Sequence, residues 1–149
     1  MRVSERLSAK IPLWLQPSHR LAIPPYFNVW YLVLDGADLP NKIGLHEWQN
    51  IVNNAFVYAC AHNRIEAARL LLQKGAEIDA IPPGFDYAGT GLHYAALRGH
   101  RQMVEFLLDQ GADPNIKDTK VQSTAAGWAD YGGHKGLRLL LEKTGLKDQ

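Results

Sequence analysis

The fold of this chain is decided by residues 90–115, TGLHYAALRGHRQMVEFLLDQGADPN, which join two short apolar segments through a glycine-containing turn. In the second segment, Val104, Leu107 and Leu108 follow the i, i+3, i+4 spacing that places three apolar side chains on one face of a helix. A short helix with such a face needs a neighbour to cover it. These residues are therefore expected to form one unit of a stack of helix pairs.

The same unit occurs upstream at an offset of 36 positions. KGAEIDA at residues 74–80 corresponds to QGADPNI at residues 110–116, and each follows a leucine-rich run. The offset also places Asn63 under Gly99. Because Asn is the usual second choice after glycine for a left-handed residue at the end of a helix, this replacement favours a shared turn.

A third copy follows downstream. It begins at Thr124, 34 positions after the threonine that opens the middle copy, and it aligns Gly133 with Gly99. One residue is then missing from the alignment, so Leu140 is expected to take the place of Leu107 at an offset of 33. Three helix-turn-helix repeats are thus predicted within residues 49–149, at about 49–81, 82–117 and 118–147.

TGLHYA at residues 90–95 resembles the T-P-L-H-x-A signature of the ankyrin repeat, and the GH, V-x-x-LL and GAD-x-N elements of that family follow in register. The resemblance covers residues 53–147. It implies an all-α, ankyrin-type solenoid of stacked antiparallel helix pairs from which β-hairpin fingers project. It also implies a concave groove, formed by the fingers and the first helices, that binds other proteins.

The sequence departs from the family pattern at two positions of the repeat. The signature proline is replaced by Ala55, Gly91 and Ala125 in the three copies, so the first helices are expected to fray at their starts. Gly127 stands where the middle copy has His93, whose imidazole in this family ties the finger to the helix. A weakened last repeat is expected of a C-terminal cap, because its outer face meets water.

Residues 1–48 do not repeat cleanly, although FNVWYLVLDGADLPN at residues 27–41 echoes EFLLDQGADPN of the middle copy. This segment is interpreted as a degenerate N-terminal cap in which Trp14, Trp30 and Trp48 close the exposed end of the stack. The alternative is that these aromatic side chains form a dimer interface or bind the rest of a larger protein.

The resemblance assigns partner binding to the fingers and to variable positions near the end of each first helix. The family period is ~33 residues, so the 36-residue step implies an insertion, which lengthens the finger at residues 81–89. An aromatic pair on this finger beside Arg98 has the composition of a binding hot spot. Alternatively, Phe85 folds back on the hairpin and Arg98 is solvated. The candidate partner-binding residues are Phe85, Asp86, Tyr87, Leu97, Arg98, His62, Tyr131 and Lys120.

Two further repeat positions have structural interpretations. Tyr58, Tyr94 and Trp128 share one position and are expected to pack between repeats, with a ligand-stacking site as the alternative. Cys60 aligns with Ala96 on the inner helix face, so a small buried side chain is expected rather than a reactive nucleophile.

Bulk properties exclude several classes of partner. The formal net charge is +1, from 16 basic and 15 acidic residues, which provides no strong field for a nucleic acid. No apolar stretch approaches the ~20 residues of a membrane helix, and the lone cysteine favours a reducing compartment, the cytoplasm. The six histidines lack ligand spacing, so neither a metal nor a cofactor is expected.

The sequence therefore predicts a protein–protein interaction module, a small adaptor or regulator with a protein partner in its groove, rather than an enzyme. The alternative is a structural protein that associates with itself through the tryptophan-rich N-terminal segment. We expect a monomer, with a homodimer through that segment as the alternative.

Overall fold

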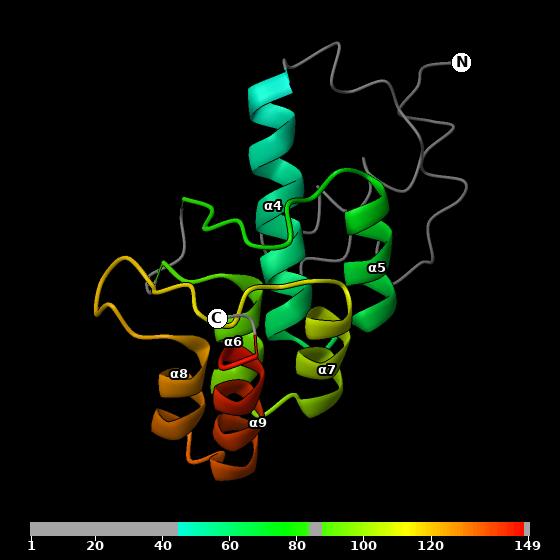
Figure 1. Ribbon diagram of the computed structural model, residues 1–149. Helices are drawn as coiled ribbons and strands as arrows, with labels where there is room; N and C mark the ends of the chain where they lie inside the picture. The colour runs from blue at the N-terminus through cyan, green and yellow to red at the C-terminus, as the bar shows by residue number, and fades with distance from the viewer. Residues whose placement is uncertain (1–44, 84–87, 148–149) are drawn as a thin grey trace, which may run out of the picture.

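The computed structural model describes residues 45–83 and 88–147, and within these ranges the chain forms three helix pairs and no strand (Figure 1). A turn of three residues joins the two helices of each pair. The helices are α4 (Leu45–Ala61), α5 (Ile65–Gln73), α6 (Gly91–Leu97), α7 (Arg101–Asp109), α8 (Ala125–Tyr131) and α9 (Lys135–Gly145). The predicted all-α repeat fold is confirmed.

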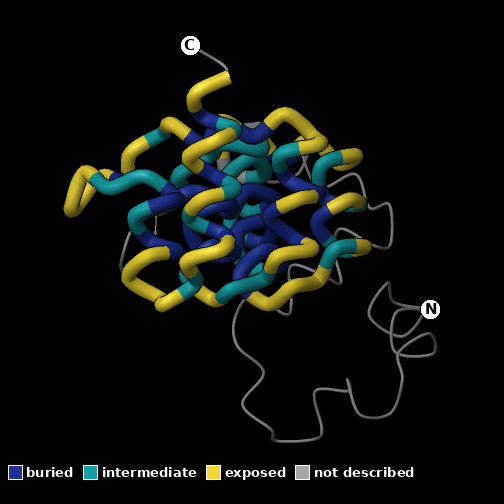
Figure 2. Tube along the Cα trace, turned by 60° about the horizontal axis from the view of Figure 1, so that its bottom comes forward, coloured by how far each residue is buried: buried dark blue, intermediate teal, exposed yellow. Residues whose placement is uncertain are grey.

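The first helices of the pairs form the centre of the stack. α6 packs against α4 on one side and α8 on the other, and each second helix packs against its own first helix. The repeat position occupied by Ala59, Ala95 and Ala129 is buried in every copy, which lets the helices approach closely. Figure 2 shows the resulting arrangement, with buried chain in the middle and exposed chain around it.

The turns between paired helices have the backbone that the alignment predicts. Asn63, Gly99 and Gly133 all adopt a positive φ, of 55°, 73° and 80° respectively. Only residues that tolerate the left-handed region can end a helix in this way, which explains why Asn is the residue that replaces glycine in the first copy.

The predicted gap in the third copy is wrong. α9 begins 34 positions after α7, so no residue is missing from the turn between α8 and α9. Leu141 is 1% exposed and corresponds to the fully buried Leu107, whereas Leu140 is only partly buried. The physical reason is that the left-handed residue stands at the same place in both turns, so the second helices begin in the same phase.

The expectation that the first helix frays at its start is also wrong for α4. This helix has 17 residues and begins ten positions before Ala55, so the stretch that is a finger in the later copies is helical here. In Figure 1 its N-terminal end projects beyond the rest of the stack. Trp48 lies on this extension and packs against the core, while Trp14 and Trp30 lie outside the described residues.

The fingers contain little β-structure in the described part of the chain. The loop between α7 and α8 has a single isolated antiparallel bridge, between Lys117 and Thr124. The lengthened finger before α6 includes residues 84–87, which lie outside the described ranges. Hairpin fingers therefore remain a prediction from the resemblance.

Gly91 and Cys60 explain how the stack accommodates the missing proline. A Cβ atom added at Gly91 would come within 2.8 Å of Cys60 Sγ, closer than real Cβ contacts allow. Cys60 is fully buried, as the alignment predicts, and burial raises the pKa of its thiol well above the usual range. The larger side chain on α4 thus fills the space that a side chain on α6 would need.

The first prediction concerns this pair. Gly91→Ala should destabilise the protein by about 1–3 kcal/mol through overpacking, and the same change in a Cys60→Ala background should be neutral or stabilising, because alanine favours helix over glycine. Urea denaturation of the four proteins measures the coupling. Additive free energies of unfolding would show that the thiol does not restrict Gly91.

The second prediction tests the corrected register of α9. Leu141→Ala and Leu107→Ala should each lower the free energy of unfolding by about 2–5 kcal/mol, because both leave a cavity in the core. Leu140→Ala serves as the matched control and should cost clearly less, since Leu140 is only partly buried. A larger loss at Leu140 than at Leu141 would restore the alignment with a missing residue.

Candidate functional site

His93 connects α6 to the finger of the next repeat. The backbone N–H of Thr90, which precedes α6, donates to His93 Nδ1 at 3.2 Å, and the Thr90 hydroxyl lies 2.8 Å from the same nitrogen. Because Nδ1 accepts a hydrogen bond, the proton is on Nε2, which donates to the carbonyl of Ser123 at 3.1 Å. The imidazole therefore links finger and helix, as the family resemblance implies.

The environment of His93 keeps it neutral. Burial lowers the pKa of its imidazole, and the hydrogen bond to Ser123 and the nearby carboxylate of Asp118 offset this only in part. With 1% of its surface exposed, the ring is not accessible to a partner. His93 is thus a structural residue of the site and positions the finger for others.

Asp118 organises the finger that carries Lys120. Its fully buried carboxylate accepts hydrogen bonds from the backbone N–H groups of Lys120, Val121 and Ser123, at 2.7–2.9 Å, and from Trp128 Nε1 at 3.0 Å. Burial raises the pKa of Asp118, but these four hydrogen bonds outweigh it and lower the pKa to about 2. Sequence reasoning missed this residue, although an aspartate that opens a polar turn is a recognised signal.

The third repeat replaces the histidine link by other contacts. At Gly127, an added Cβ would overlap Ser123 Oγ, so a side chain of the finger fills the place that an imidazole has in the middle copy. Trp128 packs edge-on against Tyr94, with ring centroids 5.2 Å apart, and against His93 at 5.1 Å. The predicted packing between repeats is confirmed for this pair, while Tyr58 stacks on His62 with centroids 4.2 Å apart.

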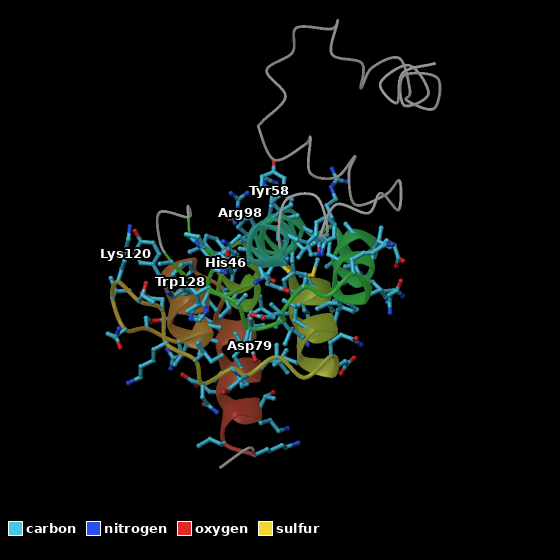
Figure 3. The ribbon with its side chains drawn as sticks, turned by 90° about the horizontal axis from the view of Figure 1, so that it is seen from above. His46, Tyr58, Asp79, Arg98, Lys120 and Trp128 are labelled. Atoms are coloured by element: carbon cyan, nitrogen blue, oxygen red, sulfur yellow. The ribbon has the colours of Figure 1, made fainter. Side chains whose placement is uncertain are left out.

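The predicted partner-binding residues that the structure describes do not form one cluster, because Lys120 lies at one end of the first helices and the others lie at the opposite end. Lys120 is exposed on the finger before α8, whereas Tyr131 is the last residue of α8. Seven helical residues, about 10 Å of helix axis, separate these ends. Figure 3 shows Lys120 on the outlying finger, apart from Arg98. Phe85, Asp86 and Tyr87 lie outside the described residues.

The structure brings His62 and Arg98 together at the ends of neighbouring first helices. Partial burial lowers the pKa of His62, and the positive charge of Arg98 lowers it further, as do Arg64 and His100. His62 and Arg98 are exposed, whereas Leu97 is partly buried against the core and offers a partner only part of its surface. Sequence reasoning did not select Arg64, which belongs to the same turn as His62, or His100, whose place beside His62 depends on the packing of one turn on the next.

Acidic residues elsewhere form contacts that hold the repeats together. The backbone N–H of Asp113 donates to the carboxylate of Asp79 at 3.1 Å. Burial raises the pKa of Asp79; the hydrogen bond from the Asp113 backbone opposes this shift, and the charge of the Asp113 carboxylate adds to it. Within residues 45–83 and 88–147, no three His, Cys, Asp or Glu side chains are grouped closely enough to hold a metal ion. None of the helices in these ranges is long and apolar enough to cross a membrane.

Known proteins share the repeat region. Palmitoyltransferase ZDHHC13 of Mus musculus is 43% identical over 61 residues, which is 41% of this chain and 10% of that protein. Palmitoyltransferase Hip14 of Drosophila melanogaster is 40% identical over 63 residues, 42% of this chain and 10% of its own length. The probable E3 ubiquitin-protein ligase XBOS34 of Oryza sativa subsp. japonica is 40% identical over 78 residues, 52% of this chain and 15% of its own.

These similarities cover only a small part of each relative, about a tenth of the palmitoyltransferases and less than a fifth of the ligase. The catalytic activities that the names state therefore belong to those proteins and are not assigned to this chain.

A family model described as ankyrin repeats in three copies matches residues 28–118 and, a second time, residues 83–148. Together the two matches span most of the sequence, and such repeats serve protein–protein interaction. The chain belongs to the ankyrin-repeat family.

Proposed function

We propose that this protein is a binding module, a small adaptor or regulator, that holds a protein partner on the surface formed by its first helices and fingers. The observation that carries this proposal is an exposed aromatic and an exposed arginine on adjoining helix ends. Tyr131 is 89% exposed at the end of α8, and Arg98 is exposed at the end of α6. The two ends are in contact, since a Cβ added at Gly132 would overlap the carbonyl oxygen of Leu97.

Neither side chain has an evident purpose within the fold. Arg98 takes part in no ion pair with the described residues, and Tyr131 contributes nothing to the buried core. Tyrosine and arginine are enriched among the few interface residues that contribute most of the binding free energy. Lys120, on the finger at the other end of α8, would extend the contact along the first helices.

A binding role accounts for the chain better than catalysis does. The relatives that are enzymes share only their repeat region with it, and the side chains of His93 and Asp118, whose pKa values are both lowered, are used to hold the finger. We further propose that the protein works as a monomer in the cytoplasm. Support for this compartment comes from its lone cysteine, Cys60, which is buried and unpaired.

The third prediction tests the surface with the double change Arg98→Glu and Tyr131→Ser. Both residues are exposed, so each change should shift the free energy of unfolding by no more than about 0.5 kcal/mol. Partner retention should fall roughly thirty-fold, because a hot-spot residue contributes about 2 kcal/mol. The measurement is the amount of partner that the unmodified protein and the variant retain from a cell extract, together with a thermal melt of each.

The control is the double change Lys143→Glu and Leu139→Ser on the outer side of α9. It makes the same change of charge and also replaces an exposed apolar side chain, since Leu139 is 62% exposed. Equal retention by control and test variant would exclude this surface and favour the N-terminal tryptophans. A third outcome would indicate self-association: the protein retains only further copies of its own chain, and both variants retain them equally well.

The fourth prediction concerns the finger that presents Lys120. Asp118→Asn should lower the free energy of unfolding at about pH 7 by about 1–3 kcal/mol, because the amide cannot accept all four hydrogen bonds. The pKa of Asp118 is depressed in the folded protein, so its contribution is complete above about pH 4 and is lost as the pH falls toward 2. Urea denaturation at a series of pH values should show the difference between the two proteins narrowing over that interval. A difference that stays constant would mean that the carboxylate is not the stabilising group.

A further inference from the structure

The outer face of the third helix pair differs from the faces that the first two pairs present to their neighbours. α8 and α9 form the last pair among the described residues (Figure 1). α7 begins 36 positions after α5, and α9 begins 34 positions after α7, so equivalent residues of the three pairs can be compared. Positions that are buried in the first two pairs and exposed only in the last are those that face a following repeat.

The first of these positions lies near the end of each first helix. Cys60 of α4 faces the next repeat, since a Cβ added at Gly91 on α6 would come within 2.8 Å of its sulfur atom. Ala96 has the same position on α6, and both residues are fully buried. On α8 this position is Asp130, whose side chain is 50% exposed. A charged residue therefore stands where the other repeats have a small buried side chain.

Two positions of the second helices change in the same way, from apolar in the first two repeats to charged in the third. In the order of the repeats they are Ala68, Val104 and Arg138, and Leu72, Leu108 and Glu142. The apolar residues are buried or pack against the core, whereas the side chains of Arg138 and Glu142 are 43% and 46% exposed. Leu141 stays buried like its counterpart Leu107. α9 thus keeps the side that faces its own repeat and changes the side that a following repeat would cover.

The three charged residues pair with one another, and we name Asp130, Arg138 and Glu142 the end triad. Arg138 Nη1 donates to Asp130 Oδ1 on α8 at 3.1 Å, and Arg138 Nε donates to Glu142 Oε1 on α9 at 2.9 Å. One guanidinium therefore connects both helices of the last pair. Exposed ion pairs contribute little to stability. Stability alone does not explain why three charged side chains replace three apolar ones.

The end triad makes the outer face unfavourable to cover. A helix pair that packed on this face as α8 packs on α6 would remove three charged groups from water, and burial of charge is strongly unfavourable unless new partners replace the water. Two carboxylates and one guanidinium also leave a net negative charge. In a symmetric dimer the same patch of both copies meets, so two such faces would repel each other.

We propose that the end triad closes the end of the stack against a second copy of this chain. The apolar residues at the same positions of the first two repeats hold one helix pair against the next, and the charges of the third repeat prevent that contact from forming between molecules. This inference goes beyond the proposed binding function, because it concerns a face that the function leaves unused. It also gives a physical basis to the monomer proposed with that function.

The fifth prediction replaces the end triad by the residues of the middle repeat, in the triple change Asp130→Ala, Arg138→Val and Glu142→Leu. The altered face would match the one that α6 and α7 present to the third repeat, so two copies should associate through it. Sedimentation velocity at increasing protein concentration should show the variant approaching about twice the mass of the unmodified protein, as expected for a symmetric dimer. A variant that keeps the mass of the unmodified protein at every concentration would overturn the proposal.

A matched control makes the same kinds of change away from the outer face of the last pair. Glu66→Ala, Arg101→Val and Glu105→Leu remove two other exposed ion pairs, alter the net charge by the same amount and should leave the mass unchanged. Equal association of control and test variant would reduce the effect to general surface hydrophobicity and overturn the role of the end triad.

A second variant tests the charges themselves and does not depend on the folding of the first. Asp130→Arg, Arg138→Glu and Glu142→Arg reverse the three charges while they preserve both ion pairs, so this variant should keep the mass of the unmodified protein. Circular dichroism of each variant checks that the helices are retained. Association of the charge-reversed variant would contradict the proposal, because its outer face is as charged as the original.

The outcomes separate this inference from the proposed function. If the apolar triple variant associates as expected while Arg98→Glu with Tyr131→Ser still retains its partner, the closed end stands and the surface proposed for the partner is wrong. If the apolar triple variant keeps its mass while the other variant loses its partner, the closed end is wrong and the binding module stands.

Discussion

Close packing of the first helices is the constraint on which the rest of the structure depends. α6 contacts both α4 and α8, and the position between them is alanine in each repeat. At the next position, the larger side chain of Cys60 takes space that a side chain at Gly91 on the neighbouring helix would need. Because interiors are packed to crystal-like density, such substitutions are accepted only in compensating pairs.

Hydrogen bonds from two histidines connect the middle repeat to the repeats on either side. His93 donates to the Ser123 carbonyl of the following finger, and His100 donates to the Ala61 carbonyl at the end of the preceding first helix. One hydrogen bond connects to the following repeat and the other to the preceding repeat, so the middle repeat is tied to both neighbours. A surface held in this way loses little conformational freedom when it binds, which favours affinity. The hydrogen bonds of Asp118 likewise restrict the conformational freedom of the finger.

A nearly neutral chain can still present a specific electrostatic pattern. Ion pairs such as Arg101 with Glu105 and Arg138 with Asp130 neutralise charge within repeats. The positions of the charged side chains that are not paired are set by how the repeats stack. Arg98, exposed at the end of α6, is left without an ion pair among the described residues.

The sequence by itself determined the helix pairs, their inner faces and their turns, including Asn63 in the place of Gly99, because these depend on spacing within a few residues. It also determined the family. The tertiary structure decided the extended start of α4, the phase of α9 and the environment of Asp118, none of which local spacing reveals. It also decided which candidate residues meet, since Arg98 joins His62 across two turns while Lys120 lies at the other end of α8. Such contacts join residues that are tens of positions apart, and only the packing of one repeat on the next sets them.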